Sequence, residues 1–361
     1  MDIQFKMPVS IVMQENCVEE NGTAISACGS RAIVVADTQG AESGALRDVT
    51  GVLRKEKITF STVTVDRYMT PVELSDFTRK NRRFDVELVI SVGGELAVNA
   101  GKALSMLLAE DDRTAGFAPG EMSSLSLPHI AVPTTARAGN EVTPLLTFRG
   151  DSGELCLFSD PALFARLALL DYRYTAAIPW EATVHGAFST VACAIEAVLS
   201  GKSSKFIRAI AWESLSNTSA VLLALEEDLV DVGSRRMMMY DSVLAGIAIS
   251  QTQASGLRGI SRLLTRDRGM PQGKAEGLLL APYLHFVWRQ KPHLIDMILH
   301  SMGFQNLDDF SKKAALLLSN KEVFSAAEIE RWAAEAAALP DMANCVAALS
   351  ERDIAQILRM I

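Results

Sequence analysis

The first half of the chain alternates strand patterns with helix patterns, and this alternation constrains the fold more than any other feature. Short apolar or alternating runs that end at polar turns or glycines predict strands at 31–37, 58–66, 84–94 and 129–135. The residues between them have the apolar spacing of helices, at 42–56, 70–83 and 95–110. Strands and helices in alternation predict a parallel sheet with right-handed crossovers.

The second half has a different character. From about Thr183 the patterns are almost only helical, as in AFSTVACAIEAVLSG and GKAEGLLLAPYLHFVW. We therefore expect two domains. The first is an α/β domain over 1–180 with a Rossmann-like parallel sheet, and the second is an all-helical domain over 181–361.

Charge and cysteine content limit the class of protein. The net charge of −8 argues against a general nucleic-acid binder and against a polybasic membrane protein. Five cysteines without CxxC spacing favour a reducing compartment over a disulfide framework. The N-terminus does not read as a signal peptide, and no stretch has the roughly 18 uncharged apolar residues of a membrane helix. We expect a cytoplasmic protein with no membrane and no nucleic-acid partner.

A glycine pair marks the junction of a strand and a helix in SVGGELAVNAGK, at 91–102. Glycines at such a junction let backbone N–H groups approach a phosphate, and the helix dipole favours the anion. The same pattern also occurs in a simple tight turn, so the motif alone leaves both interpretations open.

The order of four further blocks adds to this motif. They are PHIAVPTTARAGNEVT, LLDYRYTAAIPWEATVHGAFSTVACAIEA, LAGIAISQTQASGLRGISRLL and GMPQGKAEGLLLAPYL. In this order the chain resembles, over essentially its whole length, the iron-containing alcohol dehydrogenases, whose fold is shared with glycerol dehydrogenase and dehydroquinate synthase. The resemblance implies a dehydroquinate synthase-like fold, NAD or NADP as cofactor, a small-molecule substrate and a homodimer.

The resemblance also assigns cofactor positions. The family's GGGSxxDxAK corresponds to 93–102 and its PTTAGTGSEVT to 133–143, which gives the cofactor-binding candidates Asp37, Gly93, Gly94, Asn99, Lys102, Thr134 and Thr135. Three positions depart from the motif, as Glu95, Leu96 and Asn99. Asp37 either hydrogen-bonds the adenosine ribose or caps the next segment, and the sequence favours neither.

The family's metal ligands, an Asp and three His, are not retained. Their positions correspond to Ser189, Cys193, Arg258 and Gln272. Arginine is not a metal ligand in proteins, so we expect no metal. Cys193 then fills core space, while His185 caps its helix or faces solvent.

Three arginines stand where the family has none, at Arg137, Arg258 and Arg262. Each either pairs locally with a carboxylate such as Glu95 or Glu141, or the arginines together recognise a carboxylate or phosphate of the ligand. Arg258 and Arg262 are the catalytic candidates, because a guanidinium stabilises a developing alkoxide in place of a metal ion.

Two functions remain. One is a metal-independent, NAD(P)-dependent alcohol dehydrogenase or aldehyde reductase. The other is a non-catalytic homologue that binds an anionic small molecule in the cleft between the two domains.

Overall fold

The computed structural model describes residues 4–109, 125–150, 153–319 and 322–361. These residues form two compact units. The sheet unit comprises the described residues of 7–135 and 140–178. The helical unit comprises those of 179–361, together with 136–139 and the described residues before Met7. The sequence division had assigned 136–139 to the first domain.

The sheet unit contains a six-stranded, fully parallel sheet in the order β1-β8-β5-β4-β2-β3. Its strands are β1 (Ser10–Met13), β2 (Arg31–Ala36), β3 (Thr59–Thr64), β4 (Leu88–Gly93), β5 (His129–Pro133) and β8 (Leu167–Leu170). A separate antiparallel pair consists of β6 (Leu145–Arg149) and β7 (Leu155–Ser159). The predicted parallel sheet is confirmed.

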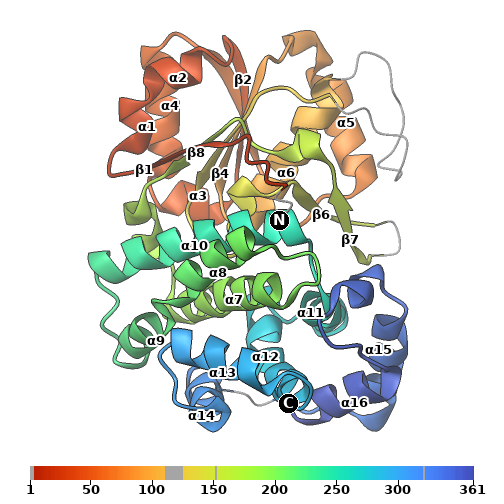
Figure 1. The fold of residues 1–361 in the computed structure, drawn as a ribbon. Helices are drawn as coiled ribbons and strands as arrows, with labels where there is room; N and C mark the ends of the chain where they lie inside the picture. The colour runs from red at the N-terminus through yellow and green to blue at the C-terminus, as the bar shows by residue number, and fades with distance from the viewer. Residues whose placement is uncertain (1–3, 110–124, 151–152, 320–321) are drawn as a thin grey trace. The chain divides into compact units, whose positions relative to one another are not determined.

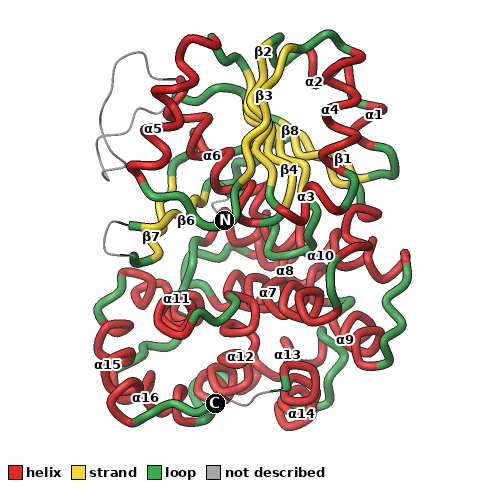
Figure 2. Tube along the Cα trace, turned by 180° about the vertical axis from the view of Figure 1, so that it is seen from behind, coloured by secondary structure: helices red, strands yellow, loops and turns green. Residues whose placement is uncertain are grey.

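Helices cover both faces of this sheet, which explains why its central strands are continuously apolar. Alternate residues of β2 enter different cores: Val34 packs in one cluster, and Ile33 and Val35 in the other. The first face carries α1 (Cys17–Glu20), α2 (Gly22–Ser26), α3 (Thr38–Glu42) and α4 (Ala45–Lys55), and the second carries α5 (Pro71–Asn81) and α6 (Glu95–Ala109) (Figures 1 and 2). Position 110, the predicted end of α6, lies outside the described residues.

The helical unit confirms the predicted change of character. It contains α7 (Trp180–Leu199), α8 (Lys205–Leu215), α9 (Thr218–Glu226), α10 (Val232–Thr252), α11 (Gly256–Arg268), α12 (Gln272–Trp288), α13 (Pro292–Ser301), α14 (Leu307–Leu318), α15 (Ala326–Ala337) and α16 (Glu351–Arg359). Among the described residues, four short 3₁₀ turns lie in the sheet unit, at η1 (Arg82–Phe84), η2 (Asn140–Val142), η3 (Pro161–Leu163) and η4 (Tyr172–Ala177). A fifth, η5 (Pro340–Asn344), lies in the helical unit.

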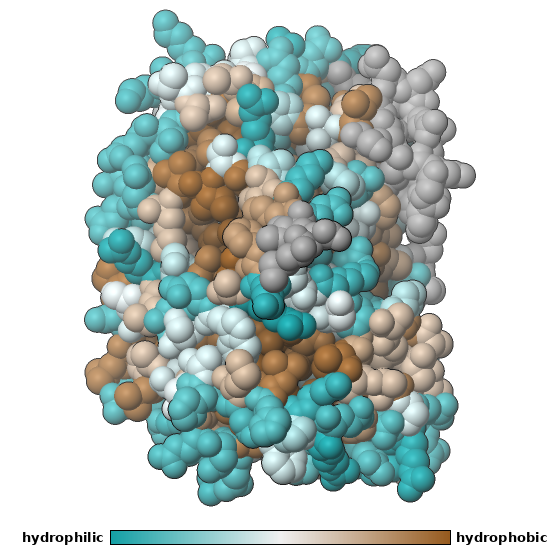
Figure 3. All heavy atoms as spheres, in the orientation of Figure 1, coloured by the Kyte–Doolittle hydropathy of each residue, from teal (hydrophilic) through white to brown (hydrophobic). Residues whose placement is uncertain are grey.

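Helix α7 lies at the centre of the helical unit and packs against α8, α10 and α12. By length and composition it would suffice to cross a membrane, but 94% of its most apolar stretch is buried inside the structure, as in a core helix. Hydrophilic and hydrophobic residues are mixed on the face shown in Figure 3. Among the described residues, the exposed large hydrophobic side chains include Leu229, Val232 and Val323.

The segment 136–139 belongs to the helical unit because of close contacts with α10. The amide of Gly139 donates to Ser242 Oγ at 3.0 Å. A side chain at Gly139 would place its Cβ 2.7 Å from the Cα of Gly246, and φ there is +60°. Glycine is therefore required at this point, where the chain approaches the helix backbone closely.

Candidate functional site

The carboxyl ends of β2 and β4 form a switch point in the sheet. These two strands are neighbours, but the chain continues from β2 to β3 on one side and from β4 to β5 on the other. In open parallel sheets, ligands bind outside the carboxyl ends of the strands at such a point. Asp37 directly follows β2, and Gly94 directly follows β4. The first candidate site therefore lies where the sequence placed the glycine motif.

Asp37 connects the two strand ends through hydrogen bonds. Its Oδ1 accepts from the amide of Gly40 at 2.9 Å, and its Oδ2 accepts from the amide of Gly94 at 2.7 Å. Burial raises the pKa of Asp37, and the two amide hydrogen bonds act in the opposite direction. Of the two predicted roles, the structure shows the cap, since Asp37 is the N-cap of α3. Each carboxylate oxygen keeps a second lone pair, so capping does not prevent a contact with a ribose.

Glycine is required at position 93 for two reasons. Its φ is +145°, and an added Cβ would lie 2.1 Å from Asp37 Oδ1. At Gly94 an added Cβ would lie 3.0 Å from Gln39 Oε1 and 3.2 Å from the γ-methyl of Thr135. The absence of a side chain at both glycines therefore lets the side chains of Asp37, Gln39 and Thr135 lie against the backbone of this turn.

Two buried polar atoms near this turn have no hydrogen-bond partner. Thr134 follows β5, and its amide donates to the carbonyl of Gly93, but its Oγ1 is unpartnered. Asn99, on α6, accepts from the amide of Thr147 at 2.9 Å, while its Nδ2 is unpartnered. Buried polar groups are normally satisfied, so these atoms have hydrogen-bonding capacity left for a water molecule or a ligand. The residues at the switch point therefore fit a dinucleotide.

Lys102 lies further along α6 and is fully buried. Its ammonium contacts five oxygens at 2.7–3.2 Å, which belong to Asn140, Thr143 and Leu145. Burial lowers the pKa of Lys102 to about 7, whereas the nearby Glu141 and Glu95 raise it. Lys102 thus joins α6 to the segment 140–145. A direct contact with a cofactor stays a prediction.

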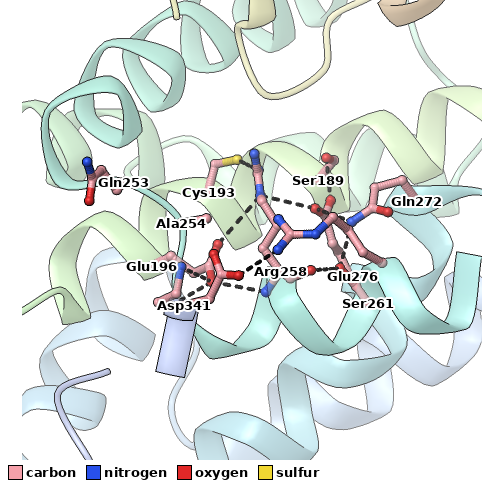
Figure 4. A network of polar contacts seen from close by, with 12 residues as sticks. Ser189, Cys193, Glu196, Gln253, Ala254, Arg258, Ser261, Gln272, Glu276 and Asp341 are labelled. Atoms are coloured by element: carbon pink, nitrogen blue, oxygen red, sulfur yellow. Dashed lines mark hydrogen bonds and ion pairs between the residues drawn. The ribbon is translucent and has the colours of Figure 1, made fainter. Parts of the chain in front are cut away.

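In the helical unit, the four positions that correspond to metal ligands lie in one hydrogen-bonded network (Figure 4). Ser189 and Cys193 come from α7, Arg258 from α11, and Gln272 from the start of α12. A terminal guanidinium nitrogen of Arg258 contacts Cys193 Sγ.

Two glutamates complete this network. Glu196 Oε1 accepts from the Ser255 amide at 3.2 Å, the Ser255 hydroxyl at 2.6 Å and the Arg258 amide at 3.1 Å. A carboxylate of α7 thereby caps the N-terminus of α11, where the helix dipole favours negative charge. Glu276 Oε2 accepts from Ser189 at 2.5 Å, and its Oε1 accepts from Gln272 at 3.1 Å.

The guanidinium of Arg258 lies between these two carboxylates. Its Nε is 3.7 Å from Glu196 Oε2 and 3.4 Å from Glu276 Oε1. Burial raises the pKa of Glu196, and the charge of Arg258 opposes that rise. Burial also raises the pKa of Cys193 to about 12, so this thiol is protonated at neutral pH.

These residues do not fit the family's divalent metal. A guanidinium contacts the neighbouring ligand position, and Cys193 is a thiol rather than the thiolate that binds metals. Within the described part of the chain, no three His, Cys, Asp or Glu side chains are arranged to hold a metal ion. We therefore derive no chemistry through a metal at this site.

Arg262 lies one turn after Arg258 and pairs with Asp341 at 2.6 Å. For Arg258 and Arg262 the structure thus shows the local-pairing alternative, with Glu196, Glu276 and Asp341 as partners instead of Glu95 or Glu141. The charges of the two arginines are largely offset, which argues against a shared anion clamp.

Cys193 and His185 both lie on α7. Cys193 is fully buried, as a core-filling residue would be. The prediction for His185 is wrong: it neither caps α7 nor faces solvent, because it lies inside the helix with 9% of its surface exposed. Burial lowers the pKa of His185, the nearby Glu181 raises it, and the cations Lys274 and Arg137 lower it further.

Sequence reasoning missed Glu196 and Glu276. The available signal was a single acidic residue within each of two strongly apolar helical runs, AIEAVL and KAEGLLL. Glutamate is almost never fully buried unless it is paired, so a cationic or hydrogen-bonding partner could have been expected for each of these glutamates. It did not identify Arg258 as that partner.

Comparison with known proteins agrees with the fold. Two family models cover nearly the whole chain: "Iron-containing alcohol dehydrogenase" matches residues 8–172, and "Fe-containing alcohol dehydrogenase family, C-terminal" matches residues 183–359. The chain belongs to the iron-containing alcohol dehydrogenase family.

Individual relatives are distant. The probable alcohol dehydrogenase EutG of Salmonella typhimurium is 29% identical over 205 residues, which is 55% of this chain and 51% of that protein. The phosphonoacetaldehyde reductase of Streptomyces viridochromogenes is 28% identical over 62% of this chain and 59% of its own length. The chain thus matches only about half of the first of these relatives.

Two solved structures share the fold over nearly their whole length. An iron-containing alcohol dehydrogenase of Thermotoga maritima is 26% identical with a TM-score of 0.90, covering 99% of this chain and 98% of that one. A sulfoacetaldehyde reductase of Bifidobacterium kashiwanohense in complex with NAD+ is 20% identical with a TM-score of 0.85, at the same coverage. The dehydroquinate synthase-like fold is confirmed.

Proposed function

We propose that this chain is an oxidoreductase that transfers hydride between a nicotinamide dinucleotide and a small alcohol or aldehyde without a bound divalent metal. One observation carries the proposal: the Gly93–Gly94 turn, Asp37 and the unpartnered Thr134 hydroxyl lie together at the switch point of a parallel sheet. Membership of the family supports the reaction class.

The cofactor supplies the hydride chemistry when it is bound, and the protein binds and orients it. Helix α6 begins directly after Gly94, and we propose that the cofactor phosphates lie at its N-terminus, beside the Gly94 amide that donates to Asp37. The carboxylate of Asp37 favours a ribose diol and repels a 2′-phosphate. We therefore propose that NAD(H) binds more tightly than NADP(H).

The substrate we propose is a small aldehyde, and an anionic one is the first class to test. Two relatives are named for sulfoacetaldehyde and phosphonoacetaldehyde. Since carboxylates already offset Arg258 and Arg262, neither arginine is assigned to substrate binding here. The catalytic role of Arg258 and Arg262 stays a prediction from the sequence.

The test is a titration of the purified protein with NADH and NADPH, followed by fluorescence, and then an aldehyde reduction assay in the presence of EDTA. We expect saturable NADH binding at micromolar concentration and turnover that EDTA does not abolish. Absence of binding by either dinucleotide would refute the proposal. Activity that appears only after addition of iron or zinc would refute its metal-independent part.

A second function is favoured by a separate observation. Ser189, Cys193 and Glu276 are buried and bonded to one another or to Arg258, which is typical of a structural core. A non-catalytic homologue would have such an arrangement, and its binding of an anionic small molecule stays a prediction from the sequence. It would show ligand-dependent stabilisation but no reduction of any aldehyde in a broad panel with NADH or NADPH.

We also propose a cytoplasmic homodimer, as the sequence predicts. Light scattering on the purified protein would test the dimer, and fractionation of the source cells would test the location.

A further inference from the structure

Two buried carboxylates of the helical unit both lie within ion-pair distance of Arg258. The side chains of Glu196 and Glu276 are 0% and 1% exposed, and that of Arg258 is 14% exposed. Carboxylates withdrawn from water need a nearby positive charge or a proton. Loss of the guanidinium would therefore leave two uncompensated acidic groups in the core.

The geometry around Arg258 suits a planar monocation. Its Nε faces one oxygen from each carboxylate, and a terminal nitrogen contacts the uncharged thiol of Cys193. Glu196 Oε2 is buried and has no hydrogen-bond partner, and the guanidinium is the cation that it faces. The guanidinium lies within ion-pair distance of carboxylates from two helices, α7 and α12, so one planar cation faces both of them.

The same arrangement does not suit a divalent metal. The described residues contain no group of three acidic, thiol or imidazole side chains at positions that could hold one.

We propose that Glu196, Glu276 and Cys193 form a guanidinium-binding cage whose resident ligand is the side chain of Arg258. Truncation of Arg258 opens this cage to a free alkylguanidinium ion, but not to a divalent metal. In the intact chain, Arg258 is a tethered cation that joins α7, α11 and α12. The proposal does not rest on the oxidoreductase activity, since binding and stability are its readouts.

The experiment uses the full chain carrying Arg258→Ala, whose thermal midpoint is measured by circular dichroism. Ethylguanidinium chloride is titrated in the millimolar range, with tetramethylammonium chloride at equal ionic strength as the cation control. Zinc chloride is titrated separately in the micromolar range. We expect a midpoint below that of the wild type and a saturable rise with ethylguanidinium alone. The wild type should show no such rise.

Arg262→Ala is the matched control. Arg262 lies one turn along the same helix, but its ion-pair partner is the single carboxylate of Asp341, at 2.6 Å. Ethylguanidinium should not produce a saturable rise in this variant. An equal rise in both variants would overturn the proposal, as would stabilisation of Arg258→Ala by zinc but not by ethylguanidinium.

A second variant covers the case in which Arg258→Ala does not fold. Adding Glu276→Gln removes one of the two uncompensated charges, while Glu196 remains to face the ligand. The double variant should fold and should still be stabilised by ethylguanidinium, at higher concentrations. A double variant that folds but shows no rise would overturn the proposal.

Discussion

Replacement of Asp37 tests how the switch point is held together. The carboxylate accepts from two backbone amides, those of Gly40 at 2.9 Å and Gly94 at 2.7 Å, and the residue is only 6% exposed. A buried donor left without an acceptor costs about 1–3 kcal/mol. Asp37→Ala orphans both amides, so it should lower the free energy of unfolding by roughly 2–6 kcal/mol. Asp37→Asn keeps one acceptor oxygen and should lose about half as much.

The assay must report on the sheet unit. All four tryptophans lie in the helical unit, so tryptophan fluorescence would not report a loss of stability confined to the sheet unit. Urea unfolding followed by circular dichroism, with hydrogen exchange at the β2 and β4 amides, reports it directly. Asp66→Ala is the control, because Asp66 follows β3 but its side chain is 77% exposed. A loss under about 0.5 kcal/mol for Asp37→Ala, as for a surface change, would refute the reasoning.

The same variant has a second readout if the proposed cofactor site is right. Removal of the carboxylate frees the Gly94 amide and ends the repulsion of a 2′-phosphate. The ratio of NADPH to NADH affinity should therefore rise in Asp37→Ala. An unchanged ratio would place the cofactor ribose away from Asp37.

Three further outcomes are expected. Burial lowers the pKa of His129 from 6.5 to about 3. Between these two pH values only the unfolded state binds the proton, so the free energy of unfolding decreases as the pH is lowered below 6.5. His129→Gln should remove about 2 kcal/mol of the loss between pH 7 and pH 5 in urea titrations. Gly273→Ala should destabilise by about 1–3 kcal/mol or more, since its Cβ would lie 2.1 Å from the carbonyl oxygen of His185, whereas Gly51→Ala has open space and should not destabilise. Elemental analysis of untagged protein should find no stoichiometric iron or zinc. One metal per chain would contradict the inference that Arg258 stands in place of a metal ligand.

Local periodicity was sufficient to predict the main elements of the sheet. The runs at β2, β3, β4 and β5 were placed correctly, because each strand's pattern lies within a few consecutive residues. The edge strand β1 and its neighbour β8 were not predicted. Each has only four residues, which is too short for a period-2 or apolar pattern to stand out from its surroundings.

The sequence by itself determined the fold class and the position of the glycine turn, because these depend on residue type and order. The tertiary structure decided what the remaining charges do. Asp37 reaches Gly94 because β2 and β4 are neighbours in the sheet, although 57 positions separate the two residues. Glu196 and Glu276 meet Arg258 because α7, α11 and α12 pack together, and no spacing along the chain contains that information. Whether an arginine attracts a ligand or neutralises the core is set by this packing, since a charge is offset only by groups that lie close to it in space.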